Sequence, residues 1–188
     1  GGQNNIARAI FNTISGGSGN LICSNGLIST IGGGQSNTIS NGYYATIAGG
    51  YANTSSSNFN FVGGGRNNSA TGGSSTVSGS YNTASGNNST VAGGLSNTAS
   101  GSHSFIGGGC SNIANSVRST VAGGQNNTAS SSGLSFVGGG QNNTASGGYF
   151  SAVAGGVSNT ASGGRSFVGG GDSNTASGYR STVGGGVS

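Results

Sequence analysis

A valine or isoleucine recurs through most of the chain at spacings of 14 to 16 residues. The members of this column are Ile31, Ile47, Val62, Val77, Val91, Ile106, Val121, Val137, Val153, Val168 and Val183. An asparagine column runs in step with it from Asn68 to Asn174, and the consensus is S-[FT]-[VI]-[GA]-G-G-x-x-N-T-A-S-G-x-x. A period this short, held over residues 31–188, predicts a solenoid.

Each repeat contains two strand-like pieces, S-[FT]-V-[GA]-G and N-T-A-S-G, separated by turns rich in glycine and asparagine. The density of glycine and β-branched residues excludes helices. We therefore expect one all-β domain, residues 1–188, folded as a parallel β-solenoid (β-roll) with coils of about 15 residues. Residues 1–30 carry a degenerate form of the repeat. Stacking about 12 coils at the spacing of β-strands predicts a rod of about 55–60 Å.

The composition excludes an ordinary globular core and several classes of function. Glycine contributes 44 of 188 residues, and Lys, Glu, Pro, Met and Trp are absent. Five dispersed arginines and a net charge of +4 do not form the basic cluster that nucleic-acid binding requires. No apolar run approaches the roughly 18–20 residues of a membrane span. The partners predicted are further copies of the chain, not nucleic acid or membrane.

Alternation of side chains along the strands assigns two faces. The Val/Ile and Ala columns are expected inside the coil. On the outer face, each of four phenylalanines is followed two residues later by glycine, whereas Thr90 and Thr120 are followed by alanine. A large side chain is thus paired with glycine and a small one with alanine, which keeps the combined volume of each pair similar. Such volume compensation indicates a close-packed surface. We therefore predict a homo-oligomer interface formed by Phe61, Thr90, Phe105, Thr120, Phe136 and Phe167.

The alternation of Phe with smaller residues also permits a different unit. A 30-residue coil would place the Phe-type and Thr-type strands on different sides of a monomer. The sequence favours the 15-residue coil in an oligomer but leaves both geometries open.

The position before each S-[FT]-V strand collects bulky residues. A row of arginine and aromatic side chains along a turn could bind a glycan or another surface ligand by stacking and hydrogen bonding. The alternative is that turn tips simply accommodate bulky residues. The candidates for surface recognition are Tyr44, His103, Arg118, Phe150, Arg165 and Arg180.

The chain offers no constellation for catalysis, a metal or a cofactor. Asp172 and His103, the only acid and the only histidine, are expected about five coils apart on turns. Calcium-binding β-rolls need an aspartate in every repeat, which is absent here. Cys23 and Cys110 are expected about six coils apart, so each is predicted to be a small packed residue or an interchain link. The sequence predicts a protein that is not an enzyme.

The segment Gly86–Gly101, G-N-N-S-T-V-A-G-G-L-S-N-T-A-S-G, resembles the head repeats of trimeric autotransporter adhesins and looks like repeats of some phage and viral fibre proteins. The resemblance covers about residues 30–188. It implies a left-handed β-roll that trimerises, and a role in extracellular adhesion or as a fibre shaft. The chain departs from the family's repeat in having Gly-Gly for Ile-Gly, N-T-A-S for an Ala-rich second strand, and Phe in every second coil.

Two functions remain after these exclusions. The first is a structural or adhesive fibre module at a cell or virion surface, assembled as a trimer or filament by lateral association. The repeat begins and ends in mid-unit without a polar cap, which also predicts end-to-end stacking. The second is an ice-binding solenoid that uses a threonine ladder. That ladder comprises Thr83, Thr98, Thr128, Thr144, Thr160 and Thr175.

Overall fold

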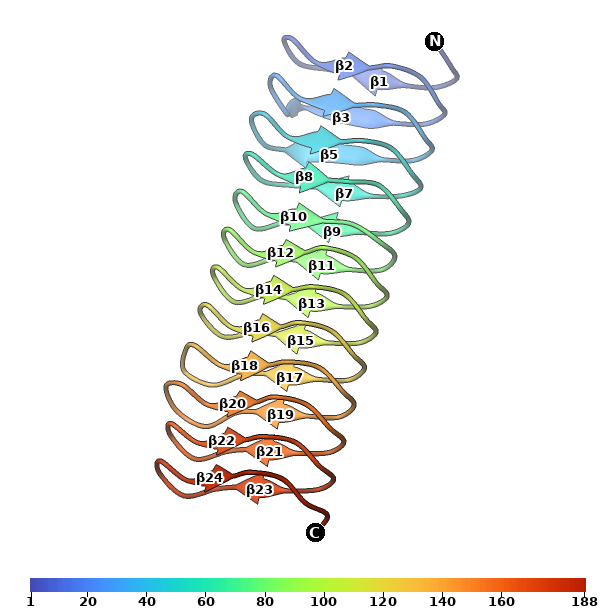
Figure 1. The fold of residues 1–188 in the computed structure, drawn as a ribbon. Helices are drawn as coiled ribbons and strands as arrows, with labels where there is room; N and C mark the ends of the chain where they lie inside the picture. The colour runs from blue at the N-terminus through green and yellow to red at the C-terminus, as the bar shows by residue number, and fades with distance from the viewer.

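The computed structural model describes all 188 residues as a parallel β-solenoid of 12 coils, with no helix (Figure 1). Each coil contributes one short strand to each of two 12-stranded parallel sheets. The odd-numbered sheet contains β1 (Ile6–Ala7), β3 (Leu21–Asn25), β5 (Thr38–Asn41), β7 (Thr54–Ser55), β9 (Ser69–Ala70), β11 (Thr83–Ala84), β13 (Thr98–Ala99), β15 (Ile113–Ala114), β17 (Thr128–Ala129), β19 (Thr144–Ala145), β21 (Thr160–Ala161) and β23 (Thr175–Ala176). The even-numbered sheet contains β2 (Thr13–Ile14), β4 (Thr30–Ile31), β6 (Thr46–Ile47), β8 (Phe61–Val62), β10 (Thr76–Val77), β12 (Thr90–Val91), β14 (Phe105–Ile106), β16 (Thr120–Val121), β18 (Phe136–Val137), β20 (Ala152–Val153), β22 (Phe167–Val168) and β24 (Thr182–Val183).

The strand register decides the length of the coil. Thr90 pairs with Phe105, and Phe105 pairs in turn with Thr120, so Phe-type and Thr-type strands alternate within one sheet. The predicted coil of about 15 residues is therefore confirmed. The 30-residue alternative is wrong, because it requires those strands to lie on different sides.

A third parallel ladder, made of single-residue bridges, runs along the glycine-rich turn. It passes from Gln3 through Arg66, Leu95 and Asp172 to Val187. The sequence reasoning missed this ladder, because the bridging position is occupied by residues as different as Ser, Tyr, Cys and Val. Backbone pairing holds the column in place regardless of the side chain.

The interior is a thin, continuous stack of small apolar side chains. The Val/Ile and Ala columns form one buried cluster of 21 residues, as the alternation predicts. The residue before the even strand lies on the same inner side. It is serine in most coils, of which Ser89, Ser104 and Ser119 are all buried, and it is Asn12, Ala45 or Asn60 before β2, β6 and β8. A coil this narrow buries no apolar side chain larger than Val or Ile, which explains the scarcity of larger apolar residues in these columns.

Asparagine side chains form a ladder inside the rod. Asn97 donates from Nδ2 to the carbonyl oxygens of Gly93 at 3.1 Å and Gly109 at 3.0 Å. Its Oδ1 accepts the backbone N–H of Asn112 at 2.9 Å. These bonds give the carbonyl of Gly93 and the N–H of Asn112 their partners, and they add a second donor to the carbonyl of Gly109, which also accepts the N–H of Leu95. The column is buried from Asn20 to Asn174.

The N-terminal 30 residues stack on the rest of the rod. Thr13 and Ile14 pair with Thr30 and Ile31, and Asn20 continues the asparagine ladder to Asn37. The strand β3 carries a register irregularity between Ile22 and Asn25. The degenerate repeats thus form coils of the same architecture, with longer turns.

Candidate recognition surfaces

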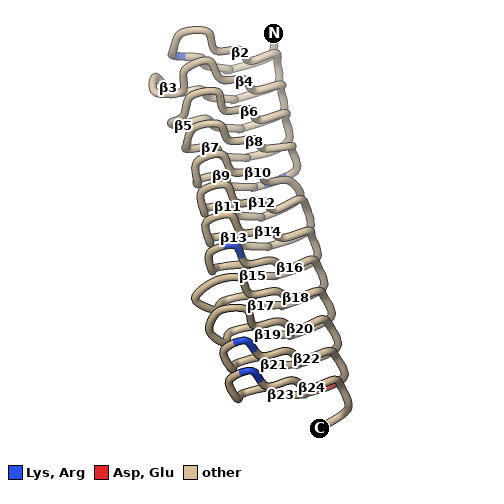
Figure 2. Tube along the Cα trace, turned by 60° about the vertical axis from the view of Figure 1, so that its left-hand side comes forward, with Lys and Arg blue, Asp and Glu red and all other residues tan.

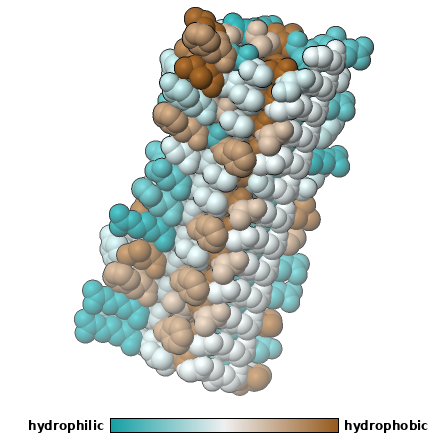
Figure 3. Space-filling view, turned by 45° about the horizontal axis from the view of Figure 1, so that its top comes forward, coloured by the Kyte–Doolittle hydropathy of each residue, from teal (hydrophilic) through white to brown (hydrophobic).

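The outer face of the even sheet carries the predicted oligomer interface. Phe61, Phe105, Phe136 and Phe167 retain 41–44% of their surface in the single chain. Thr90 and Thr120 lie half-buried in the same sheet. Figure 3 shows apolar side chains spaced at intervals along one face of the rod, among near-neutral and hydrophilic ones. All six predicted interface residues therefore share one face, and four of them present aromatic rings to the outside.

The Phe–Gly pairing has a structural reason within the chain. A Cβ on Gly107 would lie 3.5 Å from Cε1 of Phe105 and would overlap the carbonyl oxygen of Ala122 in the next coil. A Cβ on Gly138 would lie 3.3 Å from Cε1 of Phe136. The rings of Phe105 and Phe136 thus lie close to the glycine two residues ahead, and the backbone of the next coil also excludes a side chain there, so the chain itself favours glycine at these positions whether or not a partner covers the face.

The outer face of the odd sheet is a hydroxyl surface. Thr98, Thr128, Thr144 and Thr160 are half-buried and in register along the sheet, with exposed serines two residues ahead in most coils. Ile113 interrupts the threonine column between Thr98 and Thr128. This face presents two columns of small polar groups at the spacing of strands.

The six residues predicted for surface recognition lie in one row, on the turn that leads into the even strands. Each has a positive φ, between 56° and 68°. Tyr44 and Phe59, on consecutive coils of this row, stack with ring centroids 5.4 Å apart and planes 7° apart. The left-handed region disfavours side chains of this size, so the fold imposes the conformation on the row. The members are Tyr44, His103, Arg118, Phe150, Arg165 and Arg180.

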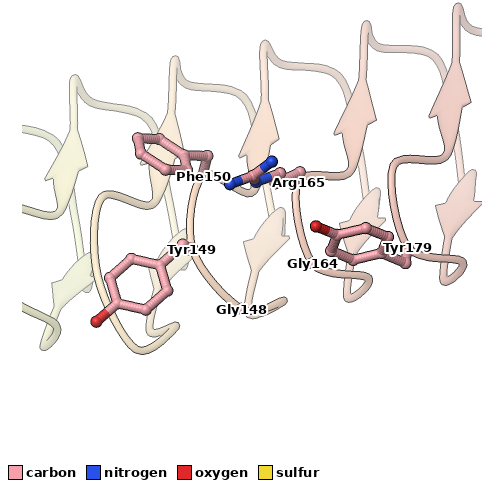
Figure 4. Close-up of a pocket in the computed structure, with 6 residues that line it drawn as sticks. All are labelled: Gly148, Tyr149, Phe150, Gly164, Arg165 and Tyr179. Atoms are coloured by element: carbon pink, nitrogen blue, oxygen red, sulfur yellow. The ribbon is translucent and has the colours of Figure 1, made fainter.

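The last three coils turn part of this row into a pocket. A cavity of about 450 Å³ opens there, and its lining residues are Gly148, Tyr149, Phe150, Gly164, Arg165 and Tyr179 (Figure 4). Phe150 and Arg165 come from the predicted row. The two tyrosines were not predicted, because they belong to the column one residue earlier in the turn. That column reads Tyr149, Gly164, Tyr179 when the coils are aligned on the serine before each even strand.

A second aromatic and arginine cluster lies on the glycine-rich turn. The guanidinium carbon of Arg66 lies 5.6 Å from the ring centroid of Tyr51 and 5.6 Å from that of Tyr81. The guanidinium occupies the space between these two tyrosines, whereas the space around Gly164 is an open pocket.

The remaining chemical groups do not converge. Asp172 is on the third ladder, where it accepts a 2.7 Å hydrogen bond from Ser173, and His103 is on the other turn beside Ser102. Cys23 and Cys110 are both free thiols, on β3 and on the third ladder. The solenoid has no helix of the length and hydropathy needed to cross a membrane.

The fold defines the class: a parallel β-solenoid repeat protein with one aromatic face, one hydroxyl face and a decorated turn. No protein-family model and no curated protein matches the chain. The resemblance to adhesin and fibre repeats therefore depends on the repeat motif alone.

Proposed function

We propose that the chain is a non-enzymatic structural module of a fibre at a cell or virion surface, and that its rods associate laterally through the even sheet. The observation that carries the proposal is the row Phe61, Phe105, Phe136 and Phe167, exposed on a regular face. No charged side chain occurs at either outward position of the even strands. Exposed apolar surface of this regularity is characteristic of an interaction site.

A second copy of the chain is the partner that fits this face best. From β14 onward, phenylalanine alternates with threonine or alanine, so ridges recur every second coil, about 9–10 Å apart. Phe136 is flanked in the sheet by Thr120 and Ala152, which leave hollows beside its ring. The ridges of one rod match the hollows of another with the same repeat. A face that pairs with itself gives a two-fold dimer, whereas a face that pairs with a different surface gives a closed ring such as a trimer, or an open filament.

The test is the mass in solution of the wild-type chain and of a variant with Phe105→Thr, Phe136→Thr and Phe167→Thr. Light scattering at about 100 µM should give an oligomer for the wild type and a monomer for the variant, since an interface core supplies most of the binding energy. Ile113→Thr is the matched control, because Ile113 is an exposed apolar residue on the opposite sheet. A monomeric wild type, or an unchanged mass in the triple variant, would contradict the proposal. The mass also distinguishes a trimer from an open filament.

The hydroxyl face supports a second candidate, binding to ice. Its specific support is the in-register column Thr128, Thr144 and Thr160, repeated at the strand spacing on a parallel sheet. Thermal hysteresis of the soluble protein measures this activity directly. Replacing Thr144 with tyrosine should abolish the hysteresis, and a wild type without hysteresis excludes the function.

A further inference from the structure

The open pocket of the last three coils is a slot with Tyr149 at one end and Tyr179 at the other. Tyr149, Gly164 and Tyr179 occupy one column on consecutive coils, so the two tyrosines are separated by two strand spacings, about 9–10 Å. The ring of Tyr179 leans over Gly164 and that of Tyr149 leans over Gly133, the preceding residue of the same column, while Gly148 leaves space between them (Figure 4). Both tyrosines are mostly exposed, at 59% and 67%. The pocket between the two tyrosines is therefore open to a ligand.

The wall of the slot also carries unpaired positive charge. The guanidinium carbon of Arg165 lies 5.9 Å from the ring centroid of Phe150, and that of Arg180 lies 5.2 Å from the ring of Tyr179. The only carboxylate side chain of the protein, Asp172, is on the third ladder. In Figure 2 the acidic segment and the basic segments of the C-terminal coils lie on opposite edges of the rod. The guanidinium N–H groups of both arginines are therefore free to donate to an anion. The planar guanidinium fits a carboxylate in particular, because it can donate two parallel hydrogen bonds to it.

We propose that this slot binds a carboxylate-bearing sugar ring of an acidic polysaccharide. The pyranose ring lies between Tyr149 and Tyr179, and its carboxylate pairs with Arg165. Aromatic side chains with a polar tip suit a ligand that has an apolar face and a hydroxylated rim. The pocket volume of about 450 Å³ is of the size that holds small ligands.

Two features favour a linear polymer. Tyr44, His103 and Arg118 continue the same row along the turn, so a chain of sugars can follow the edge of the rod. A nucleic acid fits less well, because one arginine in the slot and one beside it cannot neutralise a phosphate backbone. The biological role of this ligand, recognition by a surface fibre, rests on the proposed function. The geometry of the slot does not, because no residue of the phenylalanine face lines it.

The proposal is tested by calorimetric titration with trigalacturonate, its methyl ester and inorganic phosphate. We expect trigalacturonate to bind with a dissociation constant on the order of 1 mM or tighter. The methyl ester, which keeps the ring and removes the charge, should bind at least tenfold more weakly. Equal binding of the ester, displacement by phosphate at equal concentration, or no binding of trigalacturonate would overturn the proposal.

Single substitutions test whether trigalacturonate binds in the slot or is attracted by the net positive charge of the rod. Arg165→Gln and Tyr179→Ser should each weaken binding about tenfold. Gly164→Asn should abolish it, because a Cβ there already lies 3.1 Å from Cδ2 of Tyr179 and a longer side chain fills the slot. Arg66→Gln is the matched control, since it removes a tyrosine-flanked arginine from the other edge. If Arg66→Gln weakens binding as much as Arg165→Gln does, the slot is not the site.

The mass of each variant in solution distinguishes this proposal from the proposed function. Arg165→Gln should assemble as the wild type does, and the triple phenylalanine variant should still bind trigalacturonate. If the wild type assembles but does not bind trigalacturonate, the proposal for the slot alone is overturned. If the wild type binds trigalacturonate but is monomeric, the proposal for the lateral interface alone is overturned.

Discussion

The side-chain oxygen of Asn82 accepts a 2.7 Å hydrogen bond from the backbone N–H of Asn97, one coil further along. Asn97 repeats the relationship with Asn112, and the column extends through the rod. Each asparagine therefore joins its own coil to both neighbours. Because the side chains are buried, these bonds replace water as partners of the glycine turn.

Asn97→Ala should destabilise the rod by about 2–4 kcal/mol, because it leaves two backbone groups without partners. Those groups are the carbonyl of Gly93 and the N–H of Asn112, whereas the carbonyl of Gly109 still accepts the N–H of Leu95. Urea denaturation followed by circular dichroism measures the loss. Asn115→Ala is the control, since Asn115 is exposed. A cost for Asn97→Ala no larger than that of the control would show that the ladder contributes nothing to stability.

Two adjacent glycines of the same turn should respond in opposite ways to alanine. A Cβ on Gly94 would overlap the carbonyl oxygen of Gly109 and lie 2.8 Å from its nitrogen, and φ at Gly94 is 89°. Gly93 has open space around the same position. Gly94→Ala should therefore cost about 3 kcal/mol or more, and Gly93→Ala should change stability by less than about 1 kcal/mol. The thermal midpoints of the two variants test this, and equal midpoints would refute it.

The repeat made the coil length, the two strands and the inward columns predictable, because their signals recur at fixed spacing. Val91 and Ala99 were placed inside by alternation alone, and both are fully buried. The third ladder had no such signal, since its position holds Arg66 in one coil and Leu95 in another. Backbone hydrogen bonding maintains that ladder, and it leaves no trace in residue type.

The candidate sites were predictable only in part. The phenylalanine face and the row containing Phe150 and Arg165 followed from single columns. The slot did not, because it depends on the absence of a side chain at Gly164 between Tyr149 and Tyr179. An alignment of consecutive turns could have shown the Tyr–Gly–Tyr column, but not the cavity.

Replacing a large residue at one of the turn positions with positive φ should stabilise the rod. Arg118 has φ of 56°, a conformation in which a large side chain costs roughly 1 kcal/mol more than asparagine or glycine. Asn88 occupies the equivalent position two coils earlier. Arg118→Asn should therefore raise stability by about 0.5–1 kcal/mol, and Arg118→Val should lower it, because β-branched residues disfavour this region most. Urea midpoints in the order Val above Asn would contradict the assignment of strain.

The buried serine column should separate hydrogen-bonded hydroxyls from unpaired ones. The hydroxyl of Ser119 donates to the carbonyl of Ser116 at 2.7 Å, whereas the buried hydroxyl of Ser89 has no partner. Removing a satisfied hydroxyl costs a hydrogen bond, but removing an unsatisfied one relieves the cost of its desolvation. Ser89→Ala should therefore stabilise the rod by about 1 kcal/mol, and Ser119→Ala should destabilise it by a similar amount. Both changes remove the same atom from the same column two coils apart, so the difference between their urea midpoints isolates the hydrogen bond. Midpoints that shift equally would mean that Ser89 finds a partner in solution.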